Sequence, residues 1–232
     1  LIEDVPGVGK TSLASAMARS LNCSFKRIQF TPDIMPSDIT GFSIFNPKTG
    51  DFEYRSGSIM SQVVLADEIN RTAPKTQASL LEAMEEKQVT VDGVTHRMPE
   101  PFIVLATQNP IEYMGTYPLP EAQMDRFFMR ISLGYPGKED EVTMVSRFGG
   151  ANPLHSLRAV ATSEDILYLQ QMTERIHVDE RISEFIVDLV RETRRNAYVS
   201  LGASPRASIS LYKASQAWAL YSRRNYVLPD DV

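Results

Sequence analysis

Hydrophobic and polar positions show both strand-type and helix-type periodicity in the first part of the chain and only helix-type periodicity in the second. Up to about residue 136, short apolar or alternating runs typical of strands alternate with segments whose apolar residues recur at helical spacing. The predicted strands are residues 25–30, 62–67, 101–106 and 128–133, and the predicted helices here are residues 12–21, 76–87 and 121–127. Strands that alternate with helices are joined by crossovers, so this pattern predicts an α/β fold with a parallel sheet and helices on both faces.

Two hairpins interrupt this alternation. Residues 42–54 flank a turn at Asn46–Gly50, and residues 89–97 flank Asp92-Gly93, which is a strong hairpin signal. From Lys138 onward only helical periods occur, in residues 139–148, 163–176, 179–194 and 205–223. We therefore predict an α/β core over residues 1–136 and a small all-helical domain over residues 137–232.

Both ends of the chain read as interrupted elements. Leu1-Ile2-Glu3 is typical of the end of a strand, and residues 228–232 are typical of a helix start whose helix is missing. We therefore expect the sequence to be a fragment, truncated on both sides.

Composition narrows the class of protein. The 232 residues are 43% hydrophobic and 23% charged, which is ordinary for a globular protein. The net charge of −5 and pI near 5.3 argue against broad nonspecific contact with nucleic acid. No apolar run reaches the length of about 18 residues that a membrane span needs. The single cysteine, Cys23, excludes an internal disulfide and predicts a cytoplasmic location.

The first candidate site is the turn Asp4-Val5-Pro6-Gly7-Val8-Gly9-Lys10-Thr11. Its glycines let backbone N–H groups converge on phosphate oxygens at a helix N-terminus, where Lys10 would meet the terminal phosphates and Thr11 the Mg²⁺ ion. Asp4 stands where the strict phosphate-loop pattern has glycine, and we expect it to be tolerated because aspartate adopts a left-handed backbone more readily than most residues. The octet alone can arise by chance. The predicted nucleotide-binding residues are Pro6, Gly7, Val8, Gly9, Lys10, Thr11 and Ser12.

The second candidate site is the apolar run Val63–Ala66, which ends in Asp67 and Glu68. A buried strand with this tip delivers carboxylates to a metal and a water molecule, so we assign Asp67 with Thr11 to Mg²⁺ and Glu68 to the attacking water. With both motifs present, the sequence predicts hydrolysis of ATP with Mg²⁺. A Glu68→Gln variant is expected to bind ATP without cleaving it.

Three further polar residues are candidates for the reaction. Asn109 follows the strand 101–106 and would face the γ-phosphate beside Glu68, although Asn before Pro110 also favours a plain turn. Arg126 and Arg206 could stabilise charge on the transferred phosphate, from the same chain or a neighbour. Local pattern equally allows solvated arginines, or an ion pair with Asp125.

These motifs resemble those of the AAA+ ATPase superfamily and, within it, the MoxR family. The resemblance spans nearly the whole chain and is carried by residues 3–11, 38–41, 65–71, 80–86, 105–110 and 115–123. It implies a five-stranded core of αβα layers, a helical lid and assembly into rings, usually hexamers. Asn109 then matches sensor 1, Arg126 the arginine finger offered to the next subunit, and Arg206 sensor 2.

The resemblance also bears on partners. Both hairpins would point toward the ring pore or a client protein. Related proteins act like chaperones in metal insertion and enzyme maturation, often beside a partner with a von Willebrand factor A domain.

Two other classes of function compete with this interpretation. Helicases and their loaders share the hairpin insertions, so a nucleic-acid motor is the main alternative, although the acidic composition counts against it. A module that holds ATP without cleaving it is the third, and the full set of Lys10, Thr11, Asp67, Glu68 and Asn109 argues against it.

Overall fold

The computed structural model describes every residue of the chain except Pro6, 109–114 and 148–152. The described residues form two compact units, one of residues 1–120 with 130–163 and the other of residues 121–129 with 164–232. The second unit thus combines the C-terminal helices with a short piece of chain that includes Arg126. The boundary predicted after residue 136 stays a prediction.

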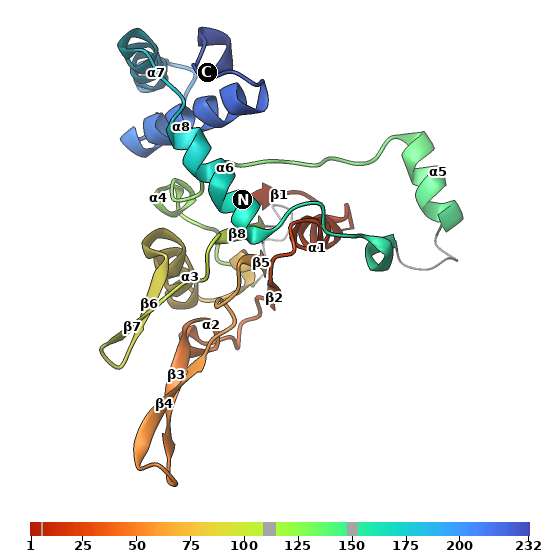
Figure 1. Cartoon of the computed structure of the whole chain (residues 1–232), viewed down its shortest axis with the longest axis vertical. Helices are drawn as coiled ribbons and strands as arrows, with labels where there is room; N and C mark the ends of the chain where they lie inside the picture. Colours follow the sequence, from red (N-terminus) through yellow and green to blue (C-terminus); the bar gives the residue numbers. More distant parts are fainter. Residues whose placement is uncertain (6, 109–114, 148–152) are drawn as a thin grey trace. The chain divides into compact units, whose positions relative to one another are not determined.

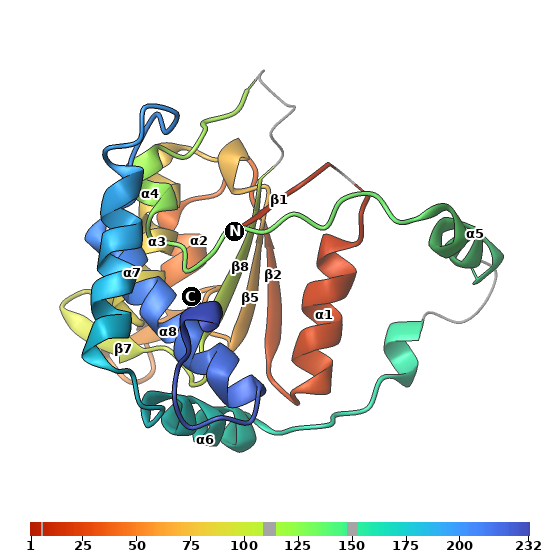
Figure 2. The ribbon, with the colours of Figure 1, turned by 90° about the horizontal axis from the view of Figure 1, so that it is seen from above.

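The first unit is built on a parallel sheet. Its strands lie in the order β1 (Ile2–Glu3), β8 (Ile103–Gln108), β5 (Val63–Asp67) and β2 (Phe25–Gln29). Every residue of β5 is buried, as expected for a strand covered on both faces. Figure 2 shows α1 (Lys10–Ser20) on one face of the sheet, and α2 (Pro36–Thr40) and α3 (Pro74–Glu86) on the other. The α/β fold predicted from the alternating pattern is confirmed.

One predicted strand is wrong. Residues 128–133 form no strand, and Ile131 makes only an isolated parallel bridge to Ile2. The N–H of Glu3 donates to the carbonyl of Ile131 at 3.0 Å, and the N–H of Ile131 donates to the carbonyl of Leu1 at 2.9 Å. Since β1 is only two residues long, it offers a short edge, and the run also crosses from the second unit into the first. Within the described residues the sheet therefore has four strands rather than five.

Two antiparallel hairpins extend from the first unit, as the turn signals predict (Figure 1). The first consists of β3 (Gly41–Asn46) and β4 (Asp51–Ser56), and the second of β6 (Gln88–Val91) and β7 (Val94–Arg97). Tyr54 of the first hairpin stacks on His96 of the second, with ring centroids 3.7 Å apart. The hairpins therefore support each other on the same side of the unit.

Short helices complete the first unit. They are α5 (Lys138–Arg147) and the 3₁₀ turns η1 (Ile69–Arg71) and η2 (Pro153–Ser156). The η1 turn directly follows the acidic end of β5, so its start fixes the backbone of Glu68.

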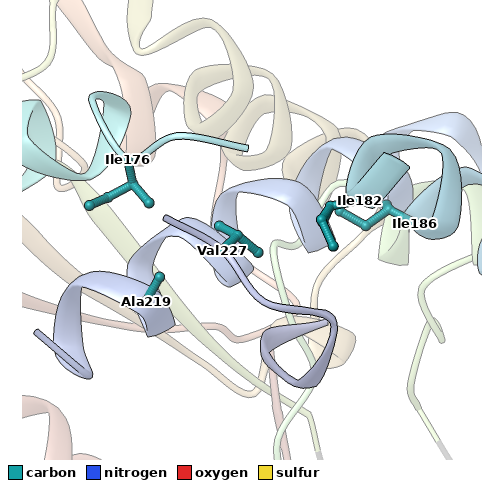
Figure 3. Close-up of a cluster of buried hydrophobic side chains, with 5 residues drawn as sticks. All are labelled: Ile176, Ile182, Ile186, Ala219 and Val227. Carbon is teal, nitrogen blue, oxygen red and sulfur yellow. The ribbon is translucent and has the colours of Figure 1, made fainter. Parts of the chain in front are cut away.

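The second unit is helical, as predicted. It contains α4 (Glu121–Met124), α6 (Ser163–Glu174), α7 (Glu180–Thr193), α8 (Pro205–Tyr221) and the 3₁₀ turn η3 (Pro229–Asp231). Asp179 and Ser204 cap α7 and α8 by accepting the N–H groups of Arg181 and Arg206. Figure 3 shows the apolar cluster that packs α7 and α8 against the segments after α6 and before η3, formed by Ile176, Ile182, Ile186, Ala219 and Val227. Among the described residues, no helix combines the length and the apolar character that a bilayer crossing requires.

The ends of β5 and β8 are joined by the hydroxyl of Thr107. This buried hydroxyl donates to Oδ1 of Asp67 at 2.6 Å and accepts the backbone N–H of Glu68 at 2.8 Å. The parallel register sets Ala66 opposite Ala106, which places Thr107 beside the acid pair. One side chain therefore holds the orientation of both acidic residues.

Replacing Thr107 with valine tests this link. Thr107→Val keeps the shape of the side chain but leaves a buried carboxylate oxygen and a backbone N–H without this partner. We expect a loss of about 1–3 kcal/mol in the free energy of unfolding, measured by urea denaturation. Thr107→Ser, which retains the hydroxyl, is the control and is expected to lose clearly less. A valine variant as stable as the wild type would contradict the assignment.

Candidate nucleotide site

The turn between β1 and α1 has the geometry of a phosphate loop. Gly7 and Gly9 have φ angles of +87° and +91°, a left-handed conformation that side chains rarely adopt. A Cβ at either position would meet open space, so backbone conformation, not crowding, requires glycine there. No side chain caps the start of α1, so its first N–H groups remain available to an anion.

Lys10 folds back over this loop. Its ammonium group donates to the carbonyl oxygen of Asp4 at 2.7 Å and lies 3.4 Å from that of Val5. The cation thus lies directly above the turn, where negative charge on a ligand would be stabilised. Val8, Thr11 and Ser12 occupy the same turn and first helical residues, whereas Pro6 lies outside the described residues.

Asp4 occupies its position for a different reason from the one that the sequence suggested. It is not among the residues with positive φ, so the glycine of the strict pattern is not needed here for its backbone freedom. Instead its nearly buried carboxylate accepts backbone N–H groups from Gly134, Leu133 and Val5. The hydrogen bond from Gly134, followed by those from Leu133 and Val5, outweighs desolvation and lowers the pKa of Asp4.

The acid pair lies at the tip of β5. Asp67 is 7% exposed, and its Oδ2 accepts two hydrogen bonds from Arg27, at 2.6 Å from Nη2 and 3.0 Å from Nε. Glu68 has a left-handed backbone (φ 59°, ψ 47°), and strain of this kind in a residue other than glycine often marks a functional site. Its Oε2 accepts from Gln29 at 2.8 Å and pairs with Arg71 at 3.2 Å.

The phosphate loop and the acid pair face one cavity of about 340 Å³. The cavity is lined by Gly7, Gly9, Lys10, Thr11, Ser12, Arg27, Asp67 and Glu68. Two motifs separated by more than fifty residues of sequence therefore contribute to the same concave surface. Lysine and arginine stand beside two carboxylates in it, as a site for a charged phosphate ligand and its counterion requires.

The donor set of this cavity suits Mg²⁺ held together with a nucleotide. In the part of the chain that the structure describes, no group of three or more histidine, cysteine, aspartate or glutamate residues could hold a metal ion. Mg²⁺ binds through one or two carboxylates and completes its shell with waters and substrate phosphates. The Thr11 hydroxyl and the Asp67 carboxylate provide a set of this size beside the loop.

A second cavity of about 450 Å³ adjoins the first and shares Gly7 and Gly9 with it. Its remaining lining is mostly apolar and consists of Val8, Leu13, Leu133, Gly134, Tyr135, Pro136, Glu141 and Met144. A largely apolar pocket next to a phosphate loop offers a flat heterocyclic base a place out of water.

Four polar residues around the acid pair were not predicted as functional from sequence. Arg27 and Gln29 are two of the three polar residues of β2, Thr107 lies near the end of β8, and Arg71 is the last residue of η1. No local signal marked the first two, because β2 is an edge strand of the sheet with exposed positions, where polar side chains are common. Their partners follow from the register, which sets Gln29 opposite Asp67 and which short-range pattern does not specify.

The structure does not test the position of the other three predicted site residues relative to this cavity. Asn109 is outside the described residues. Arg126 and Arg206 belong to the second unit, where the hydroxyl of Ser204 donates to both carboxylate oxygens of Asp125, at 2.7 and 2.9 Å. Arg206 lies 3.8 Å from the same carboxylate. Asp125, which directly precedes Arg126 in the sequence, is therefore bound to residues at the start of α8.

Comparisons with known proteins agree with this geometry. The family described as ATPase family associated with various cellular activities (AAA) matches residues 1–129, and the AAA lid domain matches residues 191–232. A crystal structure of a Cytophaga hutchinsonii protein assigned as an ATPase superposes with a TM-score of 0.90 at 42% identity, covering 99% of this chain and 72% of that one.

Two curated relatives match along the whole chain. The Bacillus subtilis protein YeaC, which is uncharacterised, is 55% identical over 100% of this chain and 72% of its own length. Chaperone MoxR1 of Mycobacterium tuberculosis is 42% identical over 100% of this chain and 63% of its own length. This chain therefore belongs to the AAA+ ATPase superfamily and, within it, to the MoxR family.

Proposed function

We propose that this chain binds ATP with Mg²⁺ in the cavity between the phosphate loop and the acid pair, and hydrolyses it to ADP and phosphate. The observation that carries the proposal is that Lys10, Thr11, Asp67 and Glu68 line the same cavity. Their side chains supply, in one place, a cation for the phosphates, a hydroxyl and a carboxylate for the metal, and a second carboxylate for the water.

Each residue has a separate task in this reaction. The loop amides and Lys10 hold the β- and γ-phosphates, while the Thr11 hydroxyl and Asp67 hold the metal, which when bound neutralises charge on the phosphates. Glu68 accepts a hydrogen bond from the attacking water and thereby orients a lone pair of the water oxygen toward the γ-phosphorus. Gln29 and Arg71 keep the Glu68 carboxylate in a fixed position, since both contact its Oε2.

Arg27 adds a second cation to the cavity. Its guanidinium group is bound to Asp67 and is about half exposed, with a relative exposure of 47% for the side chain. The pairing holds Asp67 in place from the side of β2, while Thr107 holds its other oxygen. The positive charge of Arg27, next to that of Lys10, favours a polyanionic ligand in this cavity.

We propose that Asn109, Arg126 and Arg206 complete the site. Asn109 follows β8 directly and would contact the water or the γ-phosphate at the carboxyl end of the sheet. Arg126 would stabilise the transition state on a neighbouring copy of the chain in a ring, usually a hexamer. The contacts of Asp125 with Ser204 and Arg206 support a joint action of the two arginines, because they tie both to the second unit.

The proposed client is a protein complex that the ring remodels, matures or loads with a metal. The relative from Mycobacterium tuberculosis is named a chaperone. The first hairpin offers a contact surface for such a client, because Phe42, Phe45 and Phe52 are exposed on it, Phe52 by 73%. A partner protein with a von Willebrand factor A domain and a cytoplasmic location belong to the same proposal.

Two substitutions separate binding from hydrolysis. Lys10→Ala is expected to weaken ATP binding by about 10- to 100-fold, since it removes a charged hydrogen-bond donor to phosphate. Glu68→Gln is expected to bind ATP like the wild type and to lower turnover by about 10²–10⁴-fold. Binding is measured by titration calorimetry and turnover by phosphate release.

Lys75→Ala and Glu82→Gln, which change exposed residues of α3, are the matched controls and should leave both quantities unchanged. Turnover of the Glu68→Gln variant at the wild-type rate would show that the role given to Glu68 is wrong. Binding of ATP to the Lys10→Ala variant with wild-type affinity would show that the phosphate loop does not bind ATP as proposed.

A mixing experiment tests whether Arg126 acts on a neighbour. Arg126→Ala chains should bind ATP and not cleave it, and Lys10→Ala chains should bind ATP only weakly. In a mixed ring, an intact Arg126 from a Lys10→Ala chain would face a nucleotide held by an Arg126→Ala chain, so phosphate release should partly recover. Arg195→Ala, an exposed arginine of the second unit, is the control for surface charge. No recovery in rings shown to contain both variants would contradict action in trans.

A further inference from the structure

Asp4 connects the phosphate loop to a distant segment of the first unit. Its Oδ2 accepts the N–H of Leu133 at 2.6 Å, the N–H of Gly134 at 2.8 Å and the hydroxyl of Ser132 at 3.1 Å. Its Oδ1 accepts the N–H of Val5 at 3.0 Å. The side chain is thus bound on one side to its own loop and on the other to three successive residues far along the chain.

The same residue is tied to the phosphate-binding lysine. The backbone carbonyl of Asp4 accepts the ammonium group of Lys10 at 2.7 Å. Asp4 therefore lies between the cation of the loop and the segment 132–134. A glycine here, as the strict phosphate-loop pattern has it, would leave all four donors of the carboxylate without this acceptor.

The segment held by Asp4 forms a wall of the second cavity. Leu133 and Gly134, together with the next two residues Tyr135 and Pro136, line it from one side. Gly7, Val8 and Gly9 line it from the side of the phosphate loop. The Asp4 carboxylate binds Val5, which precedes this loop wall, and Leu133 and Gly134 of the other wall, so its hydrogen bonds tie the two walls to each other.

Few side chains could replace it. An ionised carboxylate offers two acceptor oxygens, and Asp4 stays ionised at neutral pH because its hydrogen bonds lower its pKa. An asparagine has the same shape but carries an NH₂ group in place of one oxygen, so it can accept the donors on one side only, either the N–H of Val5 or those of the segment. The arrangement of donors therefore specifies an aspartate.

We propose that Asp4 is a positioning residue for nucleotide recognition, whose carboxylate holds the segment Ser132–Gly134 at the separation from the phosphate loop that a nucleotide base needs. This inference rests on the proposed function, since it names the pocket next to the phosphate site as the place of the base. Asp4 itself touches neither base nor phosphate. It acts through the wall of the pocket.

A change at Asp4 should affect binding of the base and binding of the phosphates differently. Loss of the carboxylate should displace the wall at Leu133 and Tyr135 while the glycines and Lys10 still bind phosphate. Ligands with a base should then lose affinity, and ligands that consist of phosphates alone should not. A residue that only stabilised the fold or the loop would affect both ligands alike.

The test compares ATP with inorganic tripolyphosphate, both in the presence of Mg²⁺, on the wild type and Asp4→Asn. By titration calorimetry, Asp4→Asn should weaken ATP binding about tenfold, as expected from lost hydrogen bonds to a charged group, and change tripolyphosphate binding by less than about twofold. In steady-state assays KM for ATP should rise while kcat changes little. Asp92→Asn, in the turn of the second hairpin, is the matched control and should resemble the wild type for both ligands.

Equal losses for ATP and tripolyphosphate would overturn the inference, and so would unchanged binding of both. If Asp4→Asn does not fold, Ser132→Ala removes one of the four donors and should show the same difference between the ligands at smaller size. If Ser132→Ala affected ATP and tripolyphosphate equally, that result would also overturn the inference. A wild-type protein that binds neither ligand would instead refute the proposed function, and the role of Asp4 with it.

Discussion

The site depends on the pairing of a buried carboxylate with partners from two neighbouring strands. Asp67 is almost fully buried at the end of β5, where an unpaired charge would be strongly destabilising. Arg27 of β2 and Thr107 of β8 supply its hydrogen bonds, so one side chain links three adjacent strands of the sheet. The same alignment turns Glu68 toward the phosphate loop. The chemistry proposed for the cavity is therefore a consequence of how the parallel sheet is paired.

Much of this arrangement could be predicted from local sequence, because it depends on short-range signals. The phosphate loop, the acidic strand end and both hairpins each lie within sixteen consecutive residues or fewer. The strand predicted at residues 128–133 was wrong, since its apolar run did not reveal that β1 offers too short an edge. The contacts of Arg27 and Gln29 depend on the register between β2 and β5, which sequence pattern leaves open.

Asp4 illustrates how a departure from a motif can carry information. As a variant of the glycine pattern it looked merely tolerable, with a backbone argument that the structure does not support. Its carboxylate instead binds three residues far along the chain, at Ser132, Leu133 and Gly134. Only the tertiary structure brings these donors together. The position that departs from the strict phosphate-loop pattern thus links the phosphate site to the pocket beside it.

A structure of the protein with Mg²⁺ and a non-hydrolysable ATP analogue tests the central claim most directly. We expect the triphosphate to lie along Gly7–Gly9 within hydrogen-bond distance of the Lys10 ammonium group, with the metal between the Thr11 hydroxyl and the Asp67 carboxylate. A triphosphate bound away from this cavity, or a metal remote from both Thr11 and Asp67, would contradict it.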